Sequence, residues 1–168
     1  MKKSGRVVGV CVSQRRTDPK ENVGKGFLQK GFGVVGDSHG GTEKEVSLLA
    51  IESIHRLCEE TGISAGPGCF AENITTEGMD LPSLPMGAHL QVGDAELEVT
   101  QIGKDPSEPH TYSYRGYSVL ATDGVFCKVI ESGEAKVGDV VKEINEEQQE
   151  GGRGGILQET CHPVTVVP

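Results

Sequence analysis

Three features are missing from this sequence of 168 residues, and each absence excludes a class of protein. No apolar run approaches the length of about 20 residues that a membrane-spanning helix needs. The five cysteines are odd in number and show no CxxC spacing, which favours reduced thiols over a disulfide framework or a structural zinc site. Lysine and arginine form no cluster, and the formal net charge is −9, which argues against nucleic acid and anionic membranes as partners.

The two ends of the chain differ in composition from its middle. Residues 1–16 contain two lysines and a short apolar run, but Gly9 interrupts this run and polar residues follow it. This segment predicts a first strand rather than a signal peptide, and together with the reduced thiols it indicates a cytoplasmic protein. Residues 146–155 are rich in Gly and Glu and are typical of a linker. We therefore expect one domain at residues 1–145, followed by a linker and C-terminal tail at residues 146–168.

Hydrophobic periodicity predicts mostly strands. Residues 6–12 would place Val8, Val10 and Val12 on one side of a strand and Val7, Gly9 and Cys11 on the other. Apolar and polar residues alternate at residues 89–100, where Gly93 and Asp94 form the turn of a hairpin. An apolar stripe at residues 51–61, followed by Gly62, predicts one helix. Further strands are expected at residues 27–35, 44–49, 118–121 and 125–130, and a closing hairpin at residues 137–144. Loops are expected at residues 14–25, 71–80 and 104–117. The two prolines at residues 81–85 predict an extended connection.

Many short strands, one substantial helix and 24 glycines are typical of a mainly β protein. We expect an antiparallel barrel, closed or partly open, with one main α-helix and short helical decorations.

The glycine-rich segment of residues 36–41 is the first candidate site. Three glycines within six residues allow a ligand to approach the backbone closely. Asp37 could simply cap the turn while His39 bonds a nearby carbonyl. Alternatively, His39 donates a hydrogen bond to an anionic ligand and Asp37 orients it.

The polar segment of residues 71–80 is the second candidate site. Glu72, Asn73, Thr75 and Thr76 are close together in it, with few apolar neighbours. Polar groups on a loop held by a stiff scaffold are typical of binding sites. The same side chains could instead satisfy local backbone groups and support the loop.

Three stretches of this chain resemble the MOSC domain, named for the C-terminal domain of molybdenum cofactor sulfurases and found also as small stand-alone bacterial proteins. They are GVVGDSHGGTEKEVSLLAIESI, FAENITTEGMDLPSLPMGAHLQVG with AELEVTQIGK, and DGVFCKVIESGEAKVGDVV. The likeness covers roughly residues 5–144, and several motifs in one order are more specific than one short pattern. It implies a mostly β barrel that binds molybdenum cofactor or its pterin precursor, with proteins that make or use this cofactor as partners.

The resemblance also implies a set of residues that contact the cofactor. They are Asp37, His39, Lys44, Glu72, Asn73, Thr75 and Lys104. Many family members carry an arginine just before the Val-Ser-Leu-Leu strand, where this chain has Lys44. A lysine provides a point charge and no planar fork, so its contact with phosphate would be weaker or differently directed.

Family members typically carry a cysteine that ligates the metal or carries sulfur, and this chain departs from that pattern. Residues 105–122 contain no cysteine, and Ser118 falls near the expected position. Serine can ligate molybdenum but cannot carry sulfur, which disfavours a sulfur relay. A substitute could come from Cys69, from Cys161 with His162, or from His110.

Three functions remain open from the sequence. The chain could bind molybdenum cofactor or its pterin precursor, in cofactor handling or metal-sulfur transfer. It could be a molybdenum-dependent reductase of N-hydroxylated compounds, in which the metal does the redox chemistry. It could also be a cofactor-free interaction domain that acts through its tail.

Overall fold

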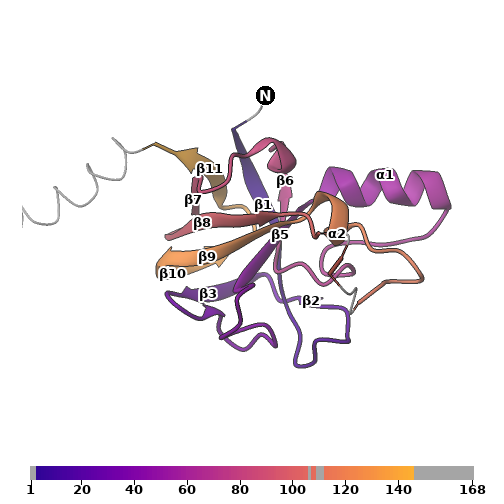
Figure 1. The fold of residues 1–168 in the computed structure, drawn as a ribbon, viewed down its shortest axis with the longest axis horizontal. Helices are drawn as coiled ribbons and strands as arrows, with labels where there is room; N and C mark the ends of the chain where they lie inside the picture. Colours follow the sequence, from indigo (N-terminus) through magenta and orange to yellow (C-terminus); the bar gives the residue numbers. More distant parts are fainter. Residues whose placement is uncertain (1–2, 106, 109–111, 146–168) are drawn as a thin grey trace, which may run out of the picture.

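The computed structural model describes residues 3–105, 107–108 and 112–145, which form a mainly β structure (Figure 1). The tail at residues 146–168 lies outside the described residues. The helical elements are α1 (Ile51–Thr61), the 3-10 helix η1 (Leu81–Ser83) and α2 (Leu120–Asp123). The strands are β1 (Ser4–Val12), β2 (Glu21–Asn22), β3 (Lys25–Gln29), β4 (Gly33–Val34), β5 (Val46–Ala50), β6 (Ile74–Glu77), β7 (His89–Val92), β8 (Ala95–Ile102), β9 (Val125–Glu131), β10 (Gly133–Lys136) and β11 (Val140–Ile144).

Seven strands close into a barrel in the order β1, β11, β7, β8, β9, β5, β6 and back to β1. The closure is the antiparallel pairing of β1 with β11, in which Ser4 faces Lys142 and Arg6 faces Val140. The predicted barrel is therefore confirmed, with one difference: β5 and β6 run parallel. A parallel pair needs a crossover connection, and α1 provides it.

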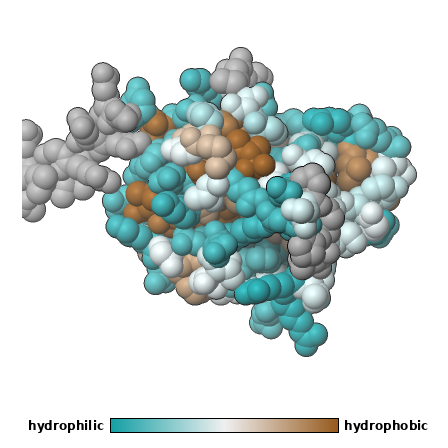
Figure 2. All heavy atoms as spheres, viewed as in Figure 1, coloured by the Kyte–Doolittle hydropathy of each residue, from teal (hydrophilic) through white to brown (hydrophobic). Residues whose placement is uncertain are grey.

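Two smaller elements extend the barrel. β2 pairs with the end of β1, and β10, β3 and β4 form a separate three-stranded sheet. Figure 1 shows this small sheet below the barrel strands and α1 projecting to one side. The face shown in Figure 2 is mostly hydrophilic, with apolar residues in a few separate patches, in keeping with the net charge of −9.

The barrel is filled by the inward-facing residues of its strands. Along β5, the side chains of Val46, Leu48 and Ala50 belong to this interior core, whereas Leu49 faces outward under α1. This alternation is the period of two expected of a strand. Because both faces of β5 are covered, all five of its residues are buried.

The predicted helix is confirmed at α1, which begins at Ile51 and ends at Thr61. Ile51 and Ile54 are buried and pack with Leu49 and Phe70 in a second core outside the barrel. Gly62 adopts φ 78°, and its N–H donates to the Cys58 carbonyl, which closes the helix in the left-handed geometry that glycine favours.

Three predictions of local structure were wrong. The expected loop at residues 71–80 contains β6, whose threonines are buried between β1 and β5. The expected strand at residues 118–121 is instead the start of α2, because its backbone bonds locally, as in the Asp123 N–H to Val119 carbonyl bond. The expected extended connection at residues 81–85 begins with η1, since Pro82 near its start needs no N–H partner there.

Two further expectations need correction. The closing hairpin predicted at residues 137–144 does not form, because β10 pairs with β3 whereas β11 pairs with β7 and β1. The expected loop at residues 14–25 contains β2, and β3 already begins at Lys25.

Among the helices of the described residues, none is long and apolar enough to cross a membrane.

Candidate functional site

A cleft opens beside the glycine turn of residues 36–41. It has a narrow inner cavity of about 50 Å³ and a wider outer hollow of about 610 Å³. The two parts adjoin each other and share four lining residues, Arg16, His39, Lys44 and Lys104. We call this the basic cleft. The inner cavity is also lined by Ser47, Phe70, Ala71, Tyr112, Ser118, Leu120, Ala121 and Phe126, and the outer hollow by Thr17, Thr42, Glu43 and Glu108.

Three cations, Arg16, Lys44 and Lys104, line the basic cleft, and they outnumber its two carboxylates, Glu43 and Glu108. Lys44 Nζ lies 2.8 Å from Glu108 Oε2 and 5.0 Å from the centre of the Phe126 ring. Burial and the neighbouring Lys44 lower the pKa of Lys104 below its ordinary value. The cations therefore repel one another, and an anion bound between them would relieve this repulsion.

Asp37 lies beneath the cleft and does not line it. Its side chain has no exposed surface, and Oδ1 accepts hydrogen bonds from Lys20 Nζ at 2.6 Å and from the Ser13 N–H at 3.0 Å. Burial alone would raise the pKa of Asp37, but these hydrogen bonds outweigh it and hold the pKa below its ordinary value. Oδ2 accepts the backbone N–H of His39 at 3.1 Å, so Asp37 orients the turn that carries His39.

His39 reaches the cleft, and its side chain is 28% exposed. Its Nδ1 lies 3.2 Å from Lys20 Nζ. Burial and the nearby Lys20 charge lower the pKa of His39 to about 4. The ring is therefore neutral at physiological pH and can offer a hydrogen bond without a charge.

The polar residues 72, 73 and 75 are buried behind the cleft wall. Asn73 Oδ1 accepts the Ser47 N–H at 3.0 Å, and its Nδ2 donates to the Cys11 carbonyl at 3.1 Å. Thr75 is fully buried in β6. These side chains lie outside the lining of the cleft, and Asn73 holds Ser47, which lines it.

Glu72 is a fully buried carboxyl, and neither of its oxygens has a hydrogen-bond partner of good geometry among the described residues. Burial raises the pKa of Glu72 to about 8, although the nearby N–H groups of Gly68 and Phe70 favour the charged form. The residue before it, Ala71, adopts φ 67°, a strained conformation for a residue with a Cβ. Ala71 lines the inner cavity, so this strain sits in the wall of the site.

The candidate metal and sulfur ligands fall in different places. Ser118, which the family resemblance places near the expected cysteine, lines the inner cavity. Cys69 is half-buried outside the cleft lining, and its Sγ accepts the Gly66 N–H at 3.4 Å. His110, Cys161 and His162 lie outside the described residues. Within the described part of the chain, no group of three His, Cys, Asp or Glu side chains could hold a metal ion.

Several residues at the site were not indicated by the sequence, among them Arg16, Lys20, Phe70 and Tyr112. Arg16 and Lys20 belong to the segment at residues 14–25. This segment has no hydrophobic periodicity from which the direction of their side chains could be predicted. Phe70 and Tyr112 form apolar walls of the inner cavity, and the Tyr112 hydroxyl donates to the Cys69 carbonyl. Their contacts come from chain segments far apart in the sequence, so no local pattern indicated them.

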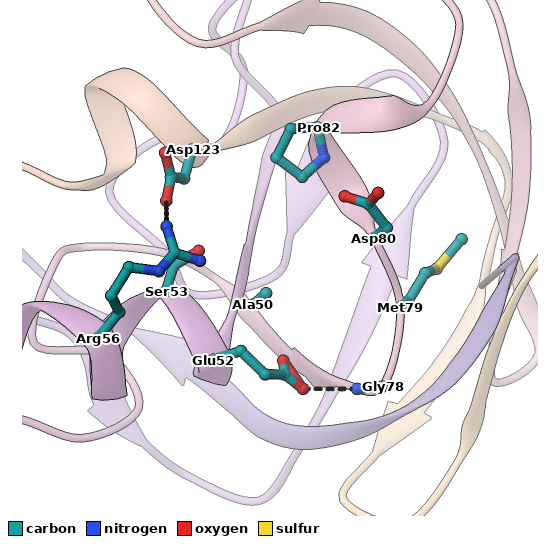
Figure 3. A pocket seen from close by; sticks show the side chains of 9 residues that line it. All are labelled: Ala50, Glu52, Ser53, Arg56, Gly78, Met79, Asp80, Pro82 and Asp123. Atoms are coloured by element: carbon teal, nitrogen blue, oxygen red, sulfur yellow. Dashed lines mark hydrogen bonds and ion pairs between the residues drawn. The ribbon is translucent and has the colours of Figure 1, made fainter. Parts of the chain in front are cut away.

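A second hollow of about 500 Å³ lies beside the start of α1 and is shown in Figure 3. Its charged side chains have protein partners: Glu52 Oε1 accepts the Gly78 N–H at 2.7 Å, Arg56 Nη1 lies 3.7 Å from Asp123 Oδ2, and Asp80 Oδ2 accepts a hydrogen bond from the Ser83 hydroxyl. Acidic residues outnumber basic ones there, so the basic cleft is the better site for an anion.

The fold and the cleft together define a closed β-barrel domain with a cleft lined by Arg16, Lys44 and Lys104 beside a Gly-Asp-Ser-His turn. The sequence model of the MOSC domain matches residues 35–142, and the chain belongs to this family, which is related to the molybdenum cofactor sulfurases. The predicted resemblance is therefore confirmed. A comparison with curated proteins gives no match.

Solved structures share the fold. The YuaD protein from Bacillus subtilis is 20% identical, with a TM-score of 0.65 over 83% of this chain and 95% of that one. YiiM from Geobacillus stearothermophilus is 16% identical, with a TM-score of 0.59 over 84% of this chain and 73% of its own. YiiM from Escherichia coli is 17% identical, with a TM-score of 0.60 over 86% of this chain and 71% of its own. At these identities the likeness establishes the fold alone.

Proposed function

We propose that the basic cleft binds molybdenum cofactor or its pterin precursor and that the protein acts in cofactor handling. The supporting observation is that three cations, Arg16, Lys44 and Lys104, line one cleft of a protein with a net charge of −9. A local group of donors recognises an anion such as a phosphate even when the whole molecule is acidic.

The cleft residues fit such a ligand in size and chemistry. The outer hollow of about 610 Å³ is within the range of small-molecule sites, whereas the inner cavity of about 50 Å³ admits only a small part of a ligand. Lys44, Lys104 and Arg16 would hold the phosphate, and His39 would hydrogen-bond a further polar atom. Phe126 beneath Lys44 offers an apolar surface beside the charge.

The Ser118 hydroxyl is the oxygen that would ligate a molybdenum atom in the inner cavity. When bound, the cofactor would supply redox or sulfur chemistry that the protein groups lack. Among the described residues that line the cleft, none is a cysteine, so we favour binding or handling of the cofactor over a relay of sulfur through this wall. Partners in this role would be proteins that make or use the cofactor, in the cytoplasm.

The test is to purify the protein from a host that makes the cofactor and measure molybdenum and oxidised pterin per chain. The variant Lys44→Met with Lys104→Met should retain at least about tenfold less pterin, because each lost charge contact contributes about 1 kcal/mol or more. Lys25→Met with Lys136→Met is the matched control, since these exposed lysines face each other on β3 and β10 outside the cleft lining. Wild-type protein free of pterin, or equal retention in the two double variants, would contradict the proposal.

A further inference from the structure

Lys20 is a charged residue whose side chain has no exposed surface. Its backbone is held by the loop that precedes β6, where the Lys20 N–H donates to the Gly68 carbonyl at 2.9 Å. Gly68 has φ 89°, and a Cβ at this position would come within 2.1 Å of the Lys20 carbonyl oxygen. Glycine at position 68 therefore lets the Lys20 segment pass close enough to bury the side chain behind the cleft.

The Lys20 ammonium has three acceptors around it. Nζ lies 2.6 Å from Asp37 Oδ1, 3.2 Å from Ser13 Oγ and 3.2 Å from His39 Nδ1. A neutral amine here would leave the buried Asp37 carboxylate without a countercharge, so the short contact requires the ammonium form. An ammonium has three N–H donors and no acceptor. His39 Nδ1 must then be the unprotonated nitrogen of the ring.

From this geometry we propose that Lys20 is a positioning residue that fixes His39 as the Nε2–H tautomer, so that the basic cleft receives a neutral N–H donor. Asp37 does not compete for the Nδ1 proton, because its Oδ2 lies 3.8 Å from Nδ1, too far for a hydrogen bond. The same oxygen accepts the His39 backbone N–H at 3.1 Å, and Thr42 Oγ1 donates to the His39 carbonyl at 2.7 Å. Both the backbone and one edge of the ring are thus fixed.

The charges around His39 support the neutral ring. Lys20, Arg16 and Lys104 face it with positive charge, and Asp37 faces it with negative charge. The Asp37 charge is already paired with Lys20. A proton on Nδ1 would place a second positive charge against the buried ammonium. The cleft therefore offers the same donor from His39 between about pH 5 and pH 8.

The tautomer can be measured on the ligand-free full chain by two-bond proton–nitrogen correlation spectra after labelling the histidines with ¹⁵N. Loss of a signal in His39→Gln assigns His39 among the five histidines. We expect a neutral Nε2–H ring at pH 7 that stays neutral down to pH 5. A proton on Nδ1, or an imidazolium at pH 7, would overturn the proposal.

The role of Lys20 is tested by Lys20→Met, which keeps the apolar stem and removes the three donors. We expect His39 to lose its fixed tautomer and its pKa to rise from about 4 towards the ordinary value, because the Asp37 charge is no longer neutralised. If the single variant does not fold, Lys20→Met with Asp37→Asn removes the unpaired buried charge and should show the same loss of tautomer. An unchanged tautomer in a folded variant would show that Lys20 does not position the ring.

The effect of Lys20 on ligand binding rests on the proposed function, and it is measured separately, as the amount of pterin that the purified protein retains. We expect Lys20→Met to retain roughly fivefold less pterin than the wild type, the effect of one misdirected hydrogen bond. Wild-type protein without pterin would reject the proposed function and leave the tautomer result intact. Unchanged pterin retention in a variant with an altered tautomer would show that the ligand does not use His39.

Discussion

Asn73 Oδ1 accepts the backbone N–H of Ser47 at 3.0 Å, and this bond joins the bend before β6 to β5 at the wall of the basic cleft. The other end of the same amide donates to the Cys11 carbonyl on β1. One side chain thus bridges three segments of the barrel wall. Its polar atoms are engaged with the protein, although the sequence suggested a contact with the ligand.

We therefore predict that Asn73→Ala lowers the free energy of unfolding by about 3 kcal/mol, because it leaves buried backbone groups unpaired. Urea denaturation measures the change. The matched control is Gln91→Ala, which removes an exposed amide bonded to the Gly93 carbonyl at 3.2 Å and should change stability by less than about 0.5 kcal/mol. Equal stability of Asn73→Ala and wild type, with loss of pterin, would instead make Asn73 a ligand contact.

Glu108→Gln should strengthen the binding of anions. Glu108 Oε2 neutralises Lys44 at 2.8 Å, and the hydrogen bond with Lys44 lowers the pKa of this carboxyl, so it is ionised at neutral pH. Removing its charge frees Lys44 for a ligand. We expect about twofold tighter binding of inorganic phosphate, followed by amide shifts in NMR titrations at low salt. The control is Glu134→Gln, which removes one negative charge at an exposed position on β10. Weaker phosphate binding by Glu108→Gln would refute the prediction.

Ser118→Cys places a thiol in the inner cavity, near the position at which the family resemblance predicts a cysteine. A thiolate is a softer ligand than a hydroxyl, so we expect the ratio of molybdenum to pterin in the purified protein to rise at least about twofold. Ser113→Cys, at an exposed position outside the cleft lining, is the matched control for added thiols. A ratio that rises equally in both variants would mean that the metal does not lie near residue 118.

The parts of the fold that follow local rules could be predicted from the sequence. The stripe of α1, its end at Gly62 and the hairpin of β7 and β8 each depend on neighbours in the chain. The polarity of β6, with the sequence Ile-Thr-Thr-Glu, favours a loop, although the segment is a strand. A strand covered on both faces loses the alternation of apolar and polar residues, and threonine favours strands.

Some residues of the candidate site could be predicted from local motifs, whereas others depend on contacts between distant parts of the chain. The family motifs predict His39, Lys44, Lys104 and Ser118 as site residues, and all four line the cleft. Lys20 could not be found, because its burial depends on the close approach of Gly68, nearly fifty positions later in the sequence. Long-range contacts of this kind carry no local signal.

Glu72 should make the stability of the protein depend on pH. Its pKa is about 8 in the folded state, against an ordinary value of 4.5, because burial penalises the charged carboxylate. Between these two values the folded state keeps a proton that the unfolded state releases. The free energy of unfolding therefore falls as pH rises through this window, by up to about 1.4 kcal/mol per pH unit, and the loss is complete above the folded pKa.

The variant Glu72→Gln removes this proton linkage and keeps the shape of the side chain. We predict that its stability relative to wild type increases from pH 5 to pH 8, as measured by urea denaturation at each pH. Glu134→Gln, at an exposed position, should show a constant difference from wild type across the same range. A constant difference for Glu72→Gln as well would mean that Glu72 is ionised in the folded state, which would require a countercharge or a bound water beside it.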